Sequence, residues 1–463
     1  MNTWKTPEEI KTAGAGLFTI RDQKFIIEHE TRFRNTFVDQ LIWNVVFAEN
    51  ENVKELARWI IWEASQSLGS PASSIHDFYI ARATDHWTDR TVPAINIRTL
   101  TYDTARTLFQ TLQKMKGAAC VFEIAKSEIT YTMQTPSEYA SCILAAALKE
   151  NYKGPVFVQG DHFQVNAKKY KESPEKEIEG LKAVIRDAIN AGFYNIDVDA
   201  STTVDLSRPS LLEQQRTNFE ITAQLTKFIR TVEPEGITVS VGGEIGEVGT
   251  KNSTVEELTA FMEGYNGALS LGREPTGMSK VSVQSGTTHG GVVLPDGSIA
   301  KVKIDFDTLE ELGKAAREQF RVGGVVQHGA STLPQSAFDN FPRRQTLEIH
   351  LATAFQNLVY DSSAFPDMLK KNIYQWLEKN CADERKTDWT NEQFYYKTRK
   401  KGFASFKKEL WSLPEATKAK LKGELAEMFE QMFESLGIPE SRTPVEKFTR
   451  ITKMHKPCPV SLE

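Results

Sequence analysis

The sequence is poor in features that would assign it to a class of protein at once. Its four cysteines have no C-x-x-C spacing, which argues against a disulfide framework and a thiolate zinc site; they are Cys120, Cys142, Cys381 and Cys458. It has no run of about 18 apolar residues and no apolar signal core, so we predict a cytoplasmic protein with no membrane partner. The net charge of −5 predicts no nucleic-acid partner.

One basic run interrupts this balanced composition, at residues 397–401, where four of the five residues are Lys or Arg. Short charge runs of this kind usually lie on the solvated face of a helix. We therefore interpret the run as solvent-facing and not as a binding patch.

What the chain does contain is an alternation of β-rich runs and amphipathic segments from about residue 92 onward. In residues 177–191, for example, apolar residues recur at helical spacing. The predicted strands are residues 92–97, 119–124, 155–160, 193–198, 237–242, 280–284, 324–327 and 346–351. Eight strands separated by helices are typical of a (β/α)8 TIM barrel, an α/β fold of roughly 250 residues.

A barrel of that size leaves roughly 200 of the 463 residues outside it. We predict a helical N-terminal extension over residues 1–90, the barrel over 91–362 and a helical C-terminal extension over 363–463. The extensions are candidates for contacts between subunits of a homo-oligomer. In the C-terminal extension, a helix is predicted over 414–436 with Gly437 as its stop, and Trp376, Trp389 and Trp411 are predicted to pack on the barrel.

Polar residues gather where the predicted strands end, which is where barrel enzymes carry their functional groups. Three of the eight histidines, His162, His289 and His328, each follow a different strand, and Asp199 and Glu244 follow two others. Three imidazoles with nearby carboxylates suit zinc and leave a coordination position for substrate. The pattern predicts a metal site, with Glu244 as a possible alternative ligand and Asp199 as a possible supporting residue.

Asp161 directly precedes a predicted ligand. Adjacent residues at a strand end point in different directions, so Asp161 need not bind the metal even if His162 does. Two roles are open on this reasoning: proton transfer beside a cation and a sugar hydroxyl, or orientation of a histidine.

Glycines after the seventh strand suggest an anion site. Gly329, Ala330 and Ser331 can expose consecutive backbone N–H groups where barrels often bind phosphate.

Six short motifs, taken together and in order, resemble the class II fructose-bisphosphate aldolases. They are Gly160-Asp161-His162, Asp199-Ala200-Ser201, residues 244–249, Thr287-Thr288-His289-Gly290, residues 304–307 and residues 328–331. The resemblance extends from about residue 93 to about residue 357.

The resemblance implies roles for individual residues. His162, His289 and His328 would bind a catalytic Zn²⁺, although another divalent metal could serve. Asp161 would remove the C4 hydroxyl proton of a ketose during cleavage and return it during condensation. The metal would stabilise the enediolate that forms when the C3–C4 bond breaks. The resemblance and the strand ends together give the following candidate substrate-binding residues: Asn96, Gly290, Gly329, Ser331, Glu348 and His350.

The sequence also departs from the family pattern. Glu348 stands where the family usually has an asparagine, and we expect its negative charge to repel a substrate phosphate. The second strand ends in residues 123–127 (EIAKS) in place of the family's phosphate-contacting serine, and Thr332 replaces a glycine. We therefore expect the metal-binding residues to match the family pattern and the phosphate-binding residues to differ from it.

Three functions follow from this pattern. The first is reversible aldol cleavage of a ketose (bis)phosphate, a sugar or sugar phosphate being the small-molecule partner. The second is a metal-dependent C4 epimerase that interconverts ketoses such as fructose and tagatose. The third is a non-catalytic aldolase-like subunit, which the complete set of three histidines disfavours.

Overall fold

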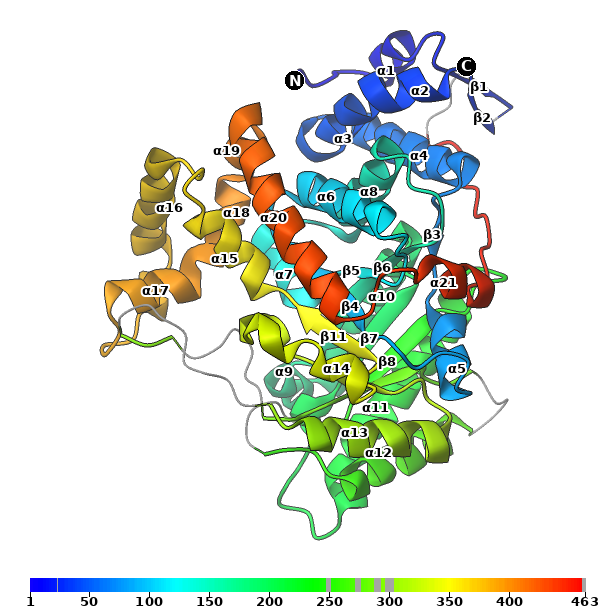
Figure 1. The fold of residues 1–463 in the computed structure, drawn as a ribbon, viewed down its shortest axis with the longest axis vertical. Helices are drawn as coiled ribbons and strands as arrows, with labels where there is room; N and C mark the ends of the chain where they lie inside the picture. Colours follow the sequence, from blue (N-terminus) through cyan, green and yellow to red (C-terminus); the bar gives the residue numbers. More distant parts are fainter. Residues whose placement is uncertain (23, 247–250, 271–275, 287–292, 296–303, 460–463) are drawn as a thin grey trace.

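A computed structural model describes residues 1–22, 24–246, 251–270, 276–286, 293–295 and 304–459. Its centre is a closed barrel of parallel strands surrounded by helices (Figure 1). The barrel strands are β4 (Val92–Asn96), β5 (Val121–Ala125), β6 (Val156–Gln164), β7 (Asn195–Asp199), β8 (Ser240–Glu244), β9 (Lys280–Val283), β10 (Val325–Gln327) and β11 (Glu348–Leu351). β11 pairs with β4, and this pairing closes the barrel. The predicted (β/α)8 fold is confirmed.

Helices follow the strands and cover the outside of the barrel. The larger ones are α6 (Thr101–Lys114), α8 (Pro136–Lys149), α10 (Pro174–Ala191), α11 (Leu211–Val232), α12 (Val255–Leu269), α13 (Phe306–Phe320) and α15 (Thr353–Asp361). Shorter elements lie in the connections: α7 (Lys126–Thr132), α9 (Ala167–Glu172), η2 (Ser201–Thr203), η3 (Ala330–Thr332), η4 (Gln335–Ala337) and α14 (Asn340–Arg343).

Helix α10 shows why these segments fold as they do. Ile178, Leu181, Ile185 and Ala188 recur at helical spacing and are all buried. The helix ends where Gly192 takes a φ of +104°, a left-handed conformation that glycine adopts without a Cβ penalty.

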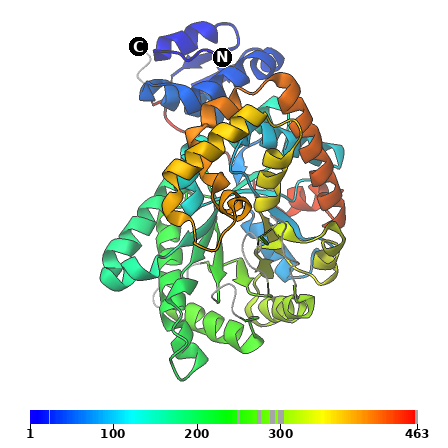
Figure 2. The same ribbon diagram turned by 90° about the vertical axis from the view of Figure 1, so that its left-hand side faces the viewer.

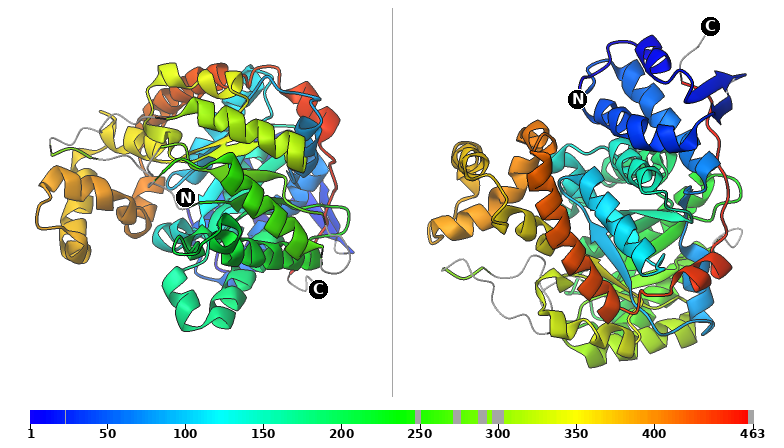
Figure 3. Two further views of the ribbon diagram at one scale, coloured as in Figure 1. Left: turned by 90° about the horizontal axis from the view of Figure 1, so that it is seen from below. Right: turned by 45° about the horizontal axis from the view of Figure 1, so that its top comes forward.

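The N-terminal region places an additional layer, the helices of residues 38–47 and 51–68, against α8 (Figures 1 and 3). Its elements are α1 (Pro7–Ala13), β1 (Phe18–Arg21), β2 (Lys24–Ile27), α2 (Glu30–Arg32), η1 (Phe33–Phe37), α3 (Val38–Phe47), α4 (Glu51–Leu68), β3 (Ala72–Ser73) and α5 (His76–Ala83). Most of it is helical, as predicted. The hairpin β1–β2 and the short strand β3, which pairs with the start of β6, were not predicted.

The C-terminal region is also helical, and Figure 2 shows part of it lying across one end of the barrel. Its elements are α16 (Asp367–Asn380), η5 (Ala382–Glu384), α17 (Asn391–Thr398), η6 (Arg399–Lys401), α18 (Gly402–Ser405), α19 (Lys407–Trp411), α20 (Glu415–Ser435) and α21 (Arg442–Phe448). The predicted stop at Gly437 is confirmed by its φ of +72°.

The three C-terminal tryptophans differ in what they pack against. Trp411 stacks on Tyr102 of the barrel helix α6, with ring centroids 6.3 Å apart, as predicted. Trp376 and Trp389 instead pack against a separate hydrophobic cluster, which consists mainly of C-terminal residues but includes Leu100 of the barrel, so for these two the packing on the barrel stays a prediction. None of the helices in the described part of the chain combines the length and the apolar composition that a membrane span requires.

Candidate active site

A β-bulge in β6 positions the two central residues of the site. The pairing of β6 with β7 shifts register between Gly160 and Phe163, so Asp161 and His162 occupy the bulge. His162 adopts a φ of +40°, which is uncommon for a residue with a side chain and is frequent at functional sites. Gly160 is required here, because a Cβ would lie 2.5 Å from the Phe163 ring.

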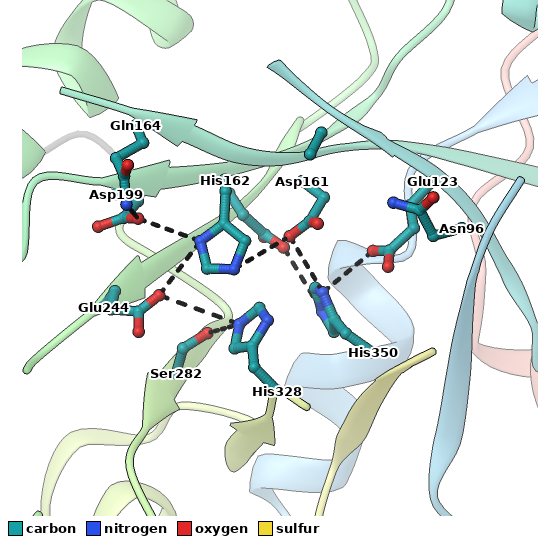
Figure 4. Close-up of polar contacts among 12 residues, drawn as sticks. Asn96, Glu123, Asp161, His162, Gln164, Asp199, Glu244, Ser282, His328 and His350 are labelled. Atoms are coloured by element: carbon teal, nitrogen blue, oxygen red, sulfur yellow. Dashed lines mark hydrogen bonds and ion pairs between the residues drawn. The ribbon is translucent and has the colours of Figure 1, made fainter. Parts of the chain in front are cut away.

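The bulge turns both side chains toward one cluster (Figure 4). Asp161, His162 and His328 each offer a ligand atom, and these atoms all lie within 4.8 Å of one another. The expectation that adjacent residues must point apart is therefore wrong at this position, because an extra residue in the strand changes the alternation.

Two overlapping groups of side chains could hold a divalent cation: the cluster of Asp161, His162 and His328, and the group of His162, Asp199 and Glu244. Glu244 Oε2 lies 3.5 Å from His162 Nδ1 and 3.9 Å from His328 Nε2. With bonds of about 2.0–2.1 Å, the donor atoms of a tetrahedral zinc site are about 3.3–3.4 Å apart. His162 faces the two groups with different ring nitrogens, because its Nε2 lies 3.8 Å from Asp161 Oδ1 and its Nδ1 lies 3.0 Å from Asp199 Oδ2. Nitrogen and carboxylate donors at these separations are the chemistry that such an ion requires.

Concentrated negative charge dominates the electrostatics of this cluster. Burial, followed by repulsion from Asp199, raises the pKa of Glu244 to about 8. Burial would lower the pKa of His162, but the nearby charge of Asp161 and the hydrogen bond with Asp199 raise it well above its usual value. Cationic charge is thus favoured between these groups.

A second group of titratable side chains adjoins Asp161. His350 Nδ1 lies 3.1 Å from Asp161 Oδ1 and 3.1 Å from Glu123 Oε2. Burial raises the pKa of Glu123, and repulsion from Asp161 adds to the rise. The centroids of the His350 and His328 rings lie 4.1 Å apart. This contact joins the group to the cluster of Asp161, His162 and His328, which we call the metal-type cluster.

A third group of charged side chains forms a buried ionic network in the barrel interior. Lys280 Nζ lies 2.5 Å from Glu348 Oε1 and 2.9 Å from Asp197 Oδ1, and it donates to Gln159 Oε1 at 2.7 Å. Gly242 leaves room for the network, because a Cβ there would lie 2.3 Å from Asp197 Oδ1. Tyr79 also donates to Glu348.

This network corrects the role expected for Glu348. Its carboxylate is fully buried, pairs with Lys280 and is not among the residues that line the cavity. Burial alone would raise the pKa of Glu348, but attraction to Lys280 and the hydrogen bond with His350 lower it below its usual value. The predicted repulsion of a substrate phosphate by Glu348 is therefore wrong, because the charge is already compensated.

The cluster opens into a cavity of about 700 Å³, a size that suits a small molecule. Among the expected substrate-binding residues, the cavity lining includes Asn96, Gly329, Ser331 and His350. Asn96 donates to Glu128, and its own Oδ1 is buried without a hydrogen-bond partner among the described residues. Ser331 Oγ accepts from the backbone N–H of Ala352 at 2.7 Å and so ties the loop after β10 to the end of β11.

The basic run at residues 397–401 does not lie entirely on a solvent-facing surface. Lys397 and Lys400 line the cavity, together with Tyr396. The interpretation of residues 397–401 as a solvated helix face is wrong for these two lysines, because η6, which directly follows α17, packs against α7 at the cavity.

Two predicted residues, the metal ligand His289 and the substrate-binding Gly290, lie outside the described residues. Sequence reasoning also left Glu123 and Lys280 without a role. Both occupy inward-facing positions of barrel strands, and a charge at such a position is the signal that could have identified them.

Comparison with known proteins places this geometry in a family. A family model described as fructose-bisphosphate aldolase class-II matches residues 82–410. A comparison with curated protein sequences gives no match.

Solved structures share the fold. A fructuronate-tagaturonate epimerase from Cohnella laeviribosi has a TM-score of 0.55 at 13% identity, covering 83% of this chain and 86% of that chain. A probable tagatose 6 phosphate kinase from Sinorhizobium meliloti 1021 has a TM-score of 0.53 at 15% identity, covering 77% of this chain and 98% of that chain. Because the family model matches residues 82–410, which include all eight barrel strands and more than half of the chain, the chain belongs to the class II fructose-bisphosphate aldolase family.

Proposed function

We propose that the protein is a metal-dependent class II aldolase that reversibly cleaves a ketose phosphate or bisphosphate between C3 and C4. The convergence of Asp161, His162 and His328 at the mouth of the barrel is the observation that carries this proposal. Family membership supports the same class of reaction.

His162 and His328, with His289 from the sequence motif, would hold the cation, and zinc suits these donors best. Glu244 is close enough to both described histidines to serve as an alternative ligand. When bound, the ion would polarise the ketose carbonyl and stabilise negative charge on its oxygen.

Asp161 is the proposed acid/base. In cleavage, its carboxylate takes the proton of the C4 hydroxyl, the C3–C4 bond breaks and C4 leaves as an aldehyde. The electron pair of that bond passes to C3, which then takes a proton. His350 Nδ1, 3.1 Å from Asp161 Oδ1, would keep the carboxylate oriented toward the cavity. Asn96 Oδ1 would accept a hydrogen bond from a substrate hydroxyl.

A C4 epimerase is the second candidate. It would use the same bond cleavage, rotate the retained aldehyde and form the bond again on its other face. The pair of Glu123 and His350 favours this candidate, because it places further proton-transfer groups next to Asp161. The structural match to a protein titled a fructuronate-tagaturonate epimerase supports it as well.

Product analysis tests the proposal. Zinc-loaded protein is incubated with fructose, tagatose and their mono- and bisphosphates, and the products are resolved by chromatography. The aldolase proposal predicts three-carbon products from a phosphorylated ketose, with none from chelator-treated protein. Interconversion of hexoses without three-carbon products would replace it with the epimerase.

A further inference from the structure

Four cations line one part of the cavity, and two of them come from the C-terminal region. They are Arg98, Lys126, Lys397 and Lys400, which we call the basic wall. We propose that the basic wall binds the anionic end of the substrate, a phosphate ester or a carboxylate, and that Lys397 and Lys400 are its specificity-determining residues. This inference rests on the proposed function, because it assigns the substrate class of the same cavity.

The basic wall is assembled from segments far apart in the sequence. Arg98 follows β4, and Lys126 begins α7, directly after β5. Lys397 lies in the last turn of α17 and Lys400 in η6, and η6 packs against α7. Figure 2 shows C-terminal helices lying across one end of the barrel, and the cavity lining joins Lys397 and Lys400 to the strand-end residues. The C-terminal region thus forms part of the cavity and not only its outer cover.

The charges of the two barrel cations are partly compensated. Arg98 Nε donates to Glu128 Oε1 at 2.7 Å, and a second Arg98 nitrogen donates to Gln356 at 2.9 Å. Lys126 Nζ donates to the backbone oxygen of Gln164 at 2.6 Å and lies 3.7 Å from Glu177. These contacts hold Arg98 and Lys126 in position and partly compensate their positive charges.

Lys400 is held differently. Its Nζ lies 5.3 Å from the centroid of the Tyr131 ring, a cation–π arrangement in which the ring does not neutralise the charge. Burial lowers the pKa of Lys400, and repulsion from Arg98 lowers it further. Burial likewise lowers the pKa of Lys397, with repulsion from Lys386 adding to it. Lys397 and Lys400 are both half-buried in the cavity lining, so an anion that enters the cavity can form charge-assisted hydrogen bonds with both ammonium groups.

Of the carboxylates that line the cavity, Glu128 is paired with Arg98 inside the basic wall, and the other two lie elsewhere. Glu123 and Asp161 contact His350, next to the metal-type cluster. One end of the cavity thus suits a cation and the reacting carbons, and the basic wall suits a terminal anion. A ketose with a phosphate or carboxylate on its last carbon matches both, whereas a neutral sugar leaves the basic wall unused.

Equilibrium binding tests this inference without requiring turnover. Isothermal titration calorimetry at low ionic strength compares glycerol 3-phosphate, glycerate and neutral glycerol as probes on the full-length protein. The wild type should bind at least one anion more tightly than glycerol. The K397Q/K400Q variant should bind that anion at least about tenfold more weakly, since each lost charge-assisted hydrogen bond has about that effect.

Lys401→Gln is the matched control, because Lys401 belongs to the same short helix but pairs with Glu384 and does not line the cavity. It should bind the probes as the wild type does. K397R/K400R, which keeps both charges, should retain binding and guards against a loss caused by misfolding. The tighter of the two anions identifies phosphate or carboxylate as the recognised group.

Anion binding by K397Q/K400Q equal to that of the wild type would overturn the inference, as would a wild type that binds neither anion more tightly than glycerol. The proposed function can fail separately. If the basic wall binds anions but no ketose is cleaved, the aldolase reaction is refuted and the anion site stands.

Discussion

Replacing Lys280 with methionine should strongly destabilise the fold. Lys280 and Glu348 are both fully buried, and Lys280 also pairs with Asp197. Methionine has nearly the length of lysine but no charge, so the variant leaves these two buried carboxylates with His350 as their remaining cationic neighbour. Removing one partner of a buried pair typically costs about 3–5 kcal/mol. Because Glu348 keeps its contacts with Tyr79 and Gln159, we expect a loss of about 3 kcal/mol.

Lys116→Met provides the contrast. Lys116 and Glu440 form an ion pair of similar length, 2.9 Å, but their side chains are 72% and 68% exposed. Exposed pairs contribute at most about 1 kcal/mol. Equilibrium urea unfolding of both variants measures the difference. A Lys280→Met variant no less stable than Lys116→Met would refute the account of the barrel interior.

The pH dependence provides a second check on the same variant. In the wild type, attraction to Lys280 outweighs burial and lowers the pKa of Glu348, so the stability from this carboxylate persists above its unfolded pKa of about 4.3. Without Lys280, only His350 still opposes the effect of burial, so the pKa of Glu348 rises relative to the wild type. The folded variant then binds a proton more strongly than the folded wild type. The difference in the free energy of unfolding between the wild type and the variant should therefore shrink as the pH falls from 8 to 5.

The other predictions concern residues of the cavity and of the buried ionic network. Asp161→Asn should lower turnover by roughly 10²–10⁴-fold while metal analysis shows unchanged zinc; near-normal turnover would contradict its acid/base role. His328→Ala should lose bound metal and activity together, and a variant that keeps one equivalent of zinc would exclude His328 as a ligand. Glu348→Asn should destabilise the protein by leaving Lys280 without this partner and should bring no gain with phosphorylated substrates; improved use of such substrates would restore the repulsion argument.

The strands of the barrel could be predicted because each is a short apolar run followed by a helical pattern. β10, for instance, is the buried segment Val325–Gln327, and its predicted range includes it. The bulge in β6 could not be predicted in the same way. It arises from the register between β6 and β7, which depends on residues of two strands and not on the local sequence.

The positions of charged residues were predicted least well, for a related reason. A basic run such as residues 397–401 has the same local pattern whether it faces water or a cavity. Only the packing of η6 against α7 decides that Lys400 lines the cavity whereas Lys401 pairs with Glu384. Likewise, the compensation of Glu348 depends on Lys280, 68 residues earlier in the chain and two strands away in the barrel.

The position of solvent deuterium in the products tests the central claim most directly. Zinc-loaded protein turns over its best phosphorylated ketose in D₂O, and mass spectrometry and NMR locate the label. Cleavage at C3–C4 predicts two three-carbon products, with one deuterium on the carbon that was C3 of the ketose. Recovery of only six-carbon sugars, with or without deuterium at C4, would contradict the claim that the protein is an aldolase.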